Sequence, residues 1–332
     1  MRSARSEAWR GVAYACAAYG SWGLLPIYWK ALAAVPVGEV LAYRVVGSAL
    51  FAALLVGLAR EGRTVRAALG ARRTVSVLAA TSLLIGANWL LFIWTVSRGD
   101  VLASSLGYFL NPLVNVALGR VFLGERLRGL QLAAVALASL GVAVLAASAG
   151  GLPWVSLTLA ITFGCYGLLR KLAPIPPLVS LLVETAALAP VALGYLTWVA
   201  ARGEGHFVPA SGEIRALLLG AGVVTALPLV WFSNAARRLR LGSLGFFQYL
   251  APTGHFALAV LVYGEPFGRA HLVTFGCIWT GLLLYSVDAV RAARSATAPA
   301  SEAAAVRAPG AAAGGGGRTG GSGVAPLGDP PV

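Results

Sequence analysis

Arg44 is a guanidinium group inside an apolar run of the sequence, between Pro36 and Ala59. Placing an arginine at bilayer depth costs at least ~2.5–3.5 kcal/mol, so the side chain must face a cavity, a partner or a ligand. Glu39 is five residues earlier, about 140° around a helix, and is therefore a poor local partner. We expect Arg44 to attract an anionic or carbonyl group of a solute. The alternative is a structural arginine bonded to helix carbonyls or to a glutamate of another helix.

Among the carboxyl groups inside apolar runs are Glu39 and Glu184. A carboxyl group at such depth must carry a proton or accept hydrogen bonds from its neighbours. Both residues are therefore candidates for proton coupling. A neutral, purely structural acid is the alternative for Glu184.

Polar and aromatic residues cluster in three further apolar runs, which gives the remaining candidates for a binding site. Tyr108 and Asn111 share one helix face, and Pro112 interrupts that helix. Pro252 interrupts a later run in the same way, and paired interruptions are a sequence indicator of a transporter site. Hydrogen bonding between helices is the alternative, and His255 by itself is typical of a satisfied core histidine. The predicted substrate-binding residues are Arg44, Asn88, Trp89, Tyr108, Asn111, Gln248 and Tyr249.

No spacing typical of a metal site, a nucleotide-binding loop or a nucleophile–base pair occurs in the sequence. The three cysteines, Cys16, Cys165 and Cys277, lie in apolar runs without CxxC spacing and are expected to be small core residues. We therefore expect no cofactor, no metal and no enzymatic activity.

The composition requires lipid as the main solvent. Of 332 residues, 58% are hydrophobic and 11% charged, whereas soluble domains average about 25% charged residues. The net charge of +14 lies in short basic clusters between apolar runs, which indicates a topology signal and not a nucleic-acid partner. A spanning helix needs about 20 apolar residues, and ten runs qualify. The predicted spans are Trp9–Trp29, Pro36–Ala59, Thr74–Ser97, Val101–Leu123, Leu130–Ser148, Leu152–Leu169, Leu178–Ala200, Ile214–Ala236, Ser243–Tyr263 and His271–Val290.

The basic residues also predict the orientation. Most of the 26 lysines and arginines fall between spans on the side of the N-terminus, so both termini are expected in the cytoplasm. Tryptophans near the ends of spans are expected to anchor them at the membrane interface: Trp9, Trp29, Trp154 and Trp198.

The two halves of the chain repeat one another. Pro112 is followed twelve residues later by Gly124-Glu125, and Pro252 twelve residues later by Gly264-Glu265. The segment 19–24 resembles 163–168 in the same order. Because five is odd, a duplicated five-helix unit enters the membrane from opposite faces, as in many secondary transporters. The expected divisions are repeats at 1–148 and 149–291 and a disordered cytoplasmic tail, rich in Ala, Gly and Pro, at 292–332.

Several of these segments together resemble the RarD branch of the EamA group, in the drug/metabolite transporter superfamily. The matching segments are Gly20-Ser21-Trp22-Gly23, Tyr43-Arg44, Ile85–Trp94, Ser105–Asn115, Leu244–Tyr249 and Tyr263-Gly264-Glu265. The resemblance spans about residues 8–290 and implies an all-α, ten-helix inner-membrane permease of two inverted five-helix repeats. The branch is associated by name with chloramphenicol sensitivity. Gly254-His255 and the tail depart from its pattern.

We therefore expect a multi-pass secondary transporter or exporter of a small polar or amphipathic solute, working by alternating access around a central cavity. Its expected partners are the lipid bilayer and the solute. A membrane scaffold or sensor is the main alternative, and an intramembrane enzyme acting on lipid-linked substrates is the weaker one. The sequence leaves the substrate, the direction of transport and the oligomeric state open.

Overall fold

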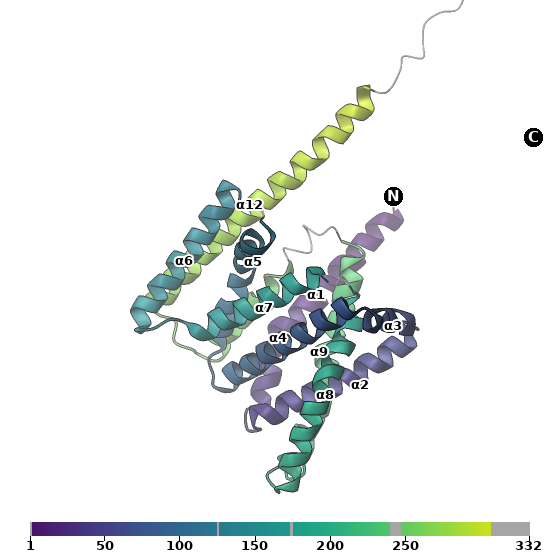
Figure 1. Ribbon diagram of the computed structural model, residues 1–332. Coiled ribbons are helices and arrows are strands. Elements are labelled where there is room, and N and C mark those ends of the chain that lie inside the picture. Colours follow the sequence, from purple (N-terminus) through teal and green to yellow (C-terminus); the bar gives the residue numbers. More distant parts are fainter. Residues whose placement is uncertain (1, 125, 173–174, 240–246, 307–332) are drawn as a thin grey trace, which may run out of the picture. The chain divides into compact units, whose positions relative to one another are not determined.

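The computed structural model describes residues 2–124, 126–172, 175–239 and 247–306, and Figure 1 shows their course. Within these ranges the chain is helical and contains no strand, as the apolar runs predict. The helices are α1 (Arg2–Ala31), α2 (Val37–Leu58), α3 (Gly62–Gly70), α4 (Arg72–Ser97), α5 (Val101–Leu123), α6 (Gly129–Ala149), α7 (Trp154–Leu172), α8 (Pro177–Ala201), α9 (Gly212–Ala236), α11 (Leu250–Ala257) with a π-helical turn (Leu258–Val262), and α12 (Arg269–Val306).

Seven helices of the described residues are long and apolar enough to cross a membrane: α2, α4, α5, α6, α8, α9 and the first part of α12. Two shorter apolar helices, Trp154–Arg170 and Leu250–Val262, fall where the sixth and ninth spans are expected. α1 extends over 30 residues and covers the first expected span. The prediction of an all-α polytopic membrane protein is therefore confirmed.

Three segments differ in detail from the sequence prediction. The basic loop after the second span contains the short amphipathic helix α3, which packs on α4 and α8. α12 continues to Val306, into the segment expected to be a disordered tail, and residues 307–332 of that segment lie outside the described residues. The first residues of the expected ninth span, 243–246, also lie outside them.

The chain divides into two compact units, Met1–Val290 and Arg291–Val332. Within the first unit, α1 packs on α9 and α4 packs on α7. In the two expected repeats, α1 corresponds to α7 and α4 corresponds to α9. The contact of α1 with α9 therefore corresponds to the contact of α7 with α4. α2 packs on α8, its own counterpart, so the contacts have the two-fold pattern that a duplicated module would produce.

Glycines allow the closest helix contacts. A Cβ atom on Gly222 of α9 would lie 2.1 Å from the carbonyl carbon of Gly47 on α2. A Cβ atom on Gly254 of α11 would lie 2.9 Å from the Cα atom of Gly23 on α1. Small residues at such crossings let helix backbones touch, which is how membrane helices gain packing contact without a hydrophobic driving force.

At one end of the first unit, α1 and α4 end and α2 and α5 begin. Leu32, Val35, Val96 and Val101 are buried there in one apolar core. The loop before α12 closes this end further, because the Glu265 carboxylate accepts hydrogen bonds from the amides of Val101 and Leu102, at 2.8 and 2.7 Å. These amides belong to the first turn of α5, which has no carbonyl partners of its own. We call this region the closed end.

Candidate functional site

A cavity of about 450 Å³ lies among α1, α4, α5, α7, α8, α9 and α11 of the first unit, so helices of both expected repeats line it. Its volume is in the range of pockets for small molecules, about 300–1,000 Å³. Aromatic rings make up much of its wall: Tyr19, Trp22, Trp89, Phe92, Tyr108, Phe163, Tyr166 and Phe232.

The cavity extends away from the closed end. Its wall includes Pro177, the first residue of α8, and Arg170, near the end of α7, as well as mid-helix residues such as Asn111. The buried closed-end residues Leu32 and Val101 do not belong to the wall. The cavity therefore reaches from the middle of the bundle toward the end at which α8 begins.

Asn88 on α4 is a polar group of the wall that makes three hydrogen bonds. Its amide nitrogen donates to the Leu159 carbonyl at 3.1 Å and to the Thr162 hydroxyl at 2.9 Å. Its amide oxygen accepts a hydrogen bond from the Tyr108 hydroxyl at 3.3 Å. Asn88 thus joins α4, α5 and α7, and its donors are already used in this conformation.

Two other wall residues keep polar atoms without a partner among the described residues. The His255 Nε2 atom lies 2.9 Å from the Trp22 carbonyl oxygen, while its Nδ1 atom has no hydrogen bond. The Asn111 Oδ1 atom is also buried without a partner. The sequence favours a fully satisfied core histidine at 255, but the structure bonds only one of its two ring nitrogens.

Arg44 lies behind the cavity wall. It is 4% exposed, and its guanidinium carbon lies over the rings of Trp29 and Trp89, at 4.8 and 4.0 Å from their centroids. The Nε and Nη1 atoms have no hydrogen-bond partner in the described part of the chain. Trp89 belongs to the wall and Arg44 does not, so the Trp89 ring separates the cation from the cavity.

Trp29 has a different place from the one its position in the sequence predicts. It is fully buried, whereas the other three predicted interface anchors are at least half exposed: Trp9 65%, Trp154 55% and Trp198 51%. The Arg44 guanidinium explains this burial, because a ring face stabilises a cation that has no counter-ion.

The two acidic candidates occupy unlike places. Glu184 lies in the cavity wall and accepts hydrogen bonds from three hydroxyls, those of Thr81 at 2.8 Å, Ser180 at 2.9 Å and Tyr166 at 3.3 Å. Three donors from three helices hold this carboxylate in one position.

Glu39 lies outside the cavity wall, at the start of α2. Its carboxylate accepts the backbone amide of His206 at 3.0 Å and lies 2.7 Å from the Nδ1 atom of the same residue. Phe207 stacks on Tyr43 with 5.3 Å between ring centroids. Glu39 thus fixes the loop between α8 and α9 to α2.

The structure gathers most of the predicted site residues into one wall. Asn88, Trp89, Tyr108, Asn111 and Gln248 line the cavity, together with Glu184. Three predicted residues do not line it: Arg44, Tyr249 and Glu39.

Sequence reasoning missed four aromatic wall residues that occupy corresponding places in the two halves. Tyr19 corresponds to Phe163 and Trp22 to Tyr166, within the repeated segments 19–24 and 163–168. The repeat itself was the signal that could have identified them, since a site between two copies of one module is lined twice by the same positions.

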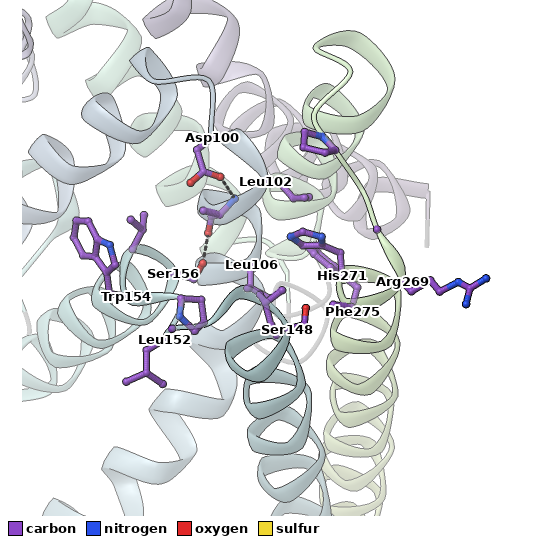
Figure 2. Close-up of a pocket in the computed structure, with 18 residues that line it drawn as sticks. Asp100, Leu102, Leu106, Ser148, Leu152, Trp154, Ser156, Arg269, His271 and Phe275 are labelled. Atoms are coloured by element: carbon purple, nitrogen blue, oxygen red, sulfur yellow. Dashed lines mark hydrogen bonds between the residues drawn. The ribbon is translucent and has the colours of Figure 1, made fainter.

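A second cavity, of about 660 Å³, lies at the closed end, among the starts of α5, α7 and α12 and the end of α6 (Figure 2). Asp100 caps α5 there, its carboxylate accepting the Ala103 amide at 3.2 Å, and the Ser156 hydroxyl donates to the Ala103 carbonyl at 2.8 Å. Figure 2 shows the Arg269 side chain pointing away from the other labelled residues. None of the predicted site residues lines this cavity.

No group of three or more His, Cys, Asp or Glu side chains in the described ranges could hold a metal ion. The three cysteines are free thiols.

Comparison with known proteins gives a consistent result. The model of the EamA-like transporter family matches residues 9–147. An uncharacterized transporter of Vibrio cholerae is 45% identical over 296 residues, covering 89% of this chain and 98% of its own. Protein RarD of Escherichia coli K12 is 44% identical over 281 residues, covering 85% of this chain and 95% of its own. A solved crystal structure superposes with a TM-score of 0.57 at 20% identity, covering 85% of this chain and 97% of that one, which supports the fold alone.

The fold and the cavity define a multi-pass helical membrane protein with a solute-sized pocket lined by helices from both halves of the sequence. The chain belongs to the EamA-like transporter family, and within it to the RarD branch of the drug/metabolite transporter superfamily. It is therefore a membrane transporter.

Proposed function

We propose that the protein carries a small polar or amphipathic solute across the inner membrane by alternating access. One observation supports this most directly: Tyr19 with Phe163, and Trp22 with Tyr166, are corresponding positions of the two halves that line one cavity. In such an arrangement the halves can exchange their shapes around a fixed site.

The wall residues divide between polar and apolar parts of the solute. Asn88, Asn111 and Gln248 would hydrogen-bond its polar groups, while Trp89 and Tyr108 would cover its apolar body. Arg44 and Tyr249 lie outside the wall in this conformation. We propose that they join the site when the halves rearrange, with Arg44 attracting an anionic or carbonyl group once the Trp89 ring moves aside.

The topology follows from the same proposal. With both termini in the cytoplasm, the end of the bundle at which α8 begins is the inner one, and the closed end faces outward. The structure then corresponds to an inward-facing state, with the Glu265 contact on α5 sealing the outer side. Opening outward would require this contact to break.

Coupling to protons would most simply use Glu184 or Glu39. Glu184 has the more direct place, because its carboxylate lies in the cavity wall where a bound solute and a bound proton would compete or cooperate. Glu39 could act only through the loop that His206 fixes to it.

The test is uptake by the purified full chain in proteoliposomes, with labelled amino acids and chloramphenicol as probes. Trp89→Ala should lower the initial rate at least about tenfold for any probe carried, because it removes a wall of the cavity. Trp198→Ala is the matched control, since Trp198 is half exposed on α8 and outside the wall. Equal rates for Trp89→Ala and the wild type would contradict the proposed site.

A membrane scaffold or sensor would give a different result. It would carry none of the probes, and changes in the cavity wall would alter folding only. Single cysteines placed after Val290 test the topology independently: labelling from outside the cell would place the C-terminal segment on the outer face and refute the orientation.

A further inference from the structure

His255 is held rigidly although it sits next to a cavity. Its ring stacks on Phe92 with centroids 5.4 Å apart and meets the Tyr108 ring edge-on at 5.6 Å. The Nε2 atom lies 2.9 Å from the Trp22 carbonyl oxygen. A backbone carbonyl of α1 and aromatic side chains of α4 and α5 therefore fix the orientation of a residue on α11, and the residue is 3% exposed.

The fixed orientation determines the chemistry of the other ring nitrogen. A carbonyl oxygen only accepts hydrogen bonds, so Nε2 must be the nitrogen that carries the hydrogen. In the neutral imidazole the Nδ1 atom is then a bare acceptor. It has no partner among the described residues, although His255 belongs to the cavity wall.

Asn111 on α5 provides a second acceptor of the same kind. Its Oδ1 atom is buried without a hydrogen bond, and the residue belongs to the same wall. Asn88, by contrast, has its oxygen bonded to Tyr108 and its nitrogen bonded twice. Buried polar groups in native proteins are nearly always bonded, so an unbonded one on a residue of a cavity wall needs an explanation.

We propose that the His255 Nδ1 atom and the Asn111 Oδ1 atom form an acceptor pair that selects solutes carrying a hydrogen-bond donor, a hydroxyl or an N–H group, on an aromatic or apolar body. The proposal rests on the transport function proposed above and names the class of solute for that site. The aromatic wall would pack against the apolar body of the solute, and the two acceptors would bind its hydrogen-bond donor. A binding site with an unpaired polar group rejects analogues that leave the group unpaired much more strongly than a purely apolar site does.

Matched probes test this selectivity by direct binding, without transport. The full chain in lipid nanodiscs is titrated by calorimetry with 3-phenylpropan-1-ol and with its methyl ether, which has the same body but no donor. A second pair, 3-phenylpropylamine and its trimethylammonium analogue, distinguishes an N–H donor from a hydroxyl. Empty nanodiscs give the background from partitioning into lipid.

The wild type should bind the donor member of at least one pair about tenfold more tightly than its partner. His255→Phe keeps the stacking on Phe92 but removes the acceptor, and should bring this ratio close to one. His255→Gln retains an acceptor and should restore part of it. Thr253→Val, an exposed position on the same helix, should leave the ratio unchanged.

Asn111→Leu on α5 decides the matter if His255→Phe does not fold, since it removes the second acceptor from a different helix. The proposal is overturned if the wild type binds both members of each pair equally, binds none of the four probes, or keeps its ratio in His255→Phe or Asn111→Leu. Uptake of any solute in proteoliposomes would leave the transport function standing in all three cases.

Discussion

The guanidinium carbon of Arg44 lies 4.0 Å from the centroid of the Trp89 ring, with the cation buried on one side and the ring lining the cavity. The same carbon lies 4.8 Å from the centroid of the Trp29 ring. Two of the guanidinium nitrogens have no hydrogen-bond partner in the described residues. A desolvated cation–π contact stabilises a cation by only about 2 kcal/mol, which is less than the free energy that burial of the charge costs. Burial of the Arg44 cation is therefore expected to lower the stability of the protein.

Arg44→Met should separate the effect of Arg44 on stability from its proposed role in transport. Removing an uncompensated buried charge while keeping an unbranched side chain should raise the unfolding midpoint of the purified protein, by an amount equivalent to ~1–3 kcal/mol. Uptake should fall at least about tenfold, because the proposed anion-binding group is gone. Thermal unfolding and proteoliposome uptake are measured on the same preparation. Unchanged uptake in Arg44→Met would remove Arg44 from the site.

Glu184 and Glu39 should respond differently in a test of proton coupling. Glu184→Gln keeps a hydrogen-bonding group among Thr81, Ser180 and Tyr166 but cannot exchange a proton, so uptake should lose its dependence on external pH. Glu39→Gln weakens only the contact with His206 and should keep the pH profile. Initial rates are followed at several external pH values. A flat profile in the wild type itself would rule out proton coupling.

The apolar runs predicted the helices because a membrane span must be apolar over about 20 residues. The correspondence of helices between the two expected repeats stays a prediction. Contacts between distant residues could not be predicted in this way. His206 belongs to a loop without periodically spaced apolar residues. Its contact with Glu39 could therefore be found only from the folded structure. Trp29 is near the end of a span, where tryptophan usually anchors, and only the tertiary position of Arg44 shows why it is buried.

The candidate site was predictable in part for the same reason. Asn88, Tyr108 and Asn111 stand out as polar groups in apolar segments, and all three reach the cavity. Whether the donor and acceptor atoms of these side chains have hydrogen-bond partners depends on the neighbouring helices. His255 shows this most clearly, because its single bond to Trp22 joins residues 233 positions apart.

Gly222→Ala should destabilise the protein strongly. The new Cβ atom would lie 2.1 Å from the carbonyl carbon of Gly47, so α2 and α9 must separate. Overpacking of this kind costs ~1–3 kcal/mol or more. Gly57→Ala is the matched control on α2, because nothing lies within 4 Å of its added Cβ atom, and it should be neutral or slightly stabilising. Equal unfolding midpoints for the two variants would contradict the close α2–α9 contact.

Glu265 should make the stability of the closed end depend on pH. It lies in the loop before α12, where burial raises the pKa of its carboxyl group above the usual 4.5, although the amides of Leu102 and Val101 favour the charged form. The native protein then binds a proton more readily than the unfolded chain does. The free energy of unfolding should accordingly decrease as the pH rises from near 4.5 through the raised native pKa, and level off above it.

Glu265→Gln removes this titration while leaving one oxygen to accept an amide of α5. The variant should show a flatter dependence of the unfolding midpoint between about pH 4 and pH 7 than the wild type, because the neutral amide does not titrate. Glu213→Gln, at an exposed position in the first turn of α9, serves as the control for a change in net charge. If wild type and Glu265→Gln had the same slope, the carboxylate would not be titrating in contact with α5, and the seal of the closed end would have to depend on its apolar core alone.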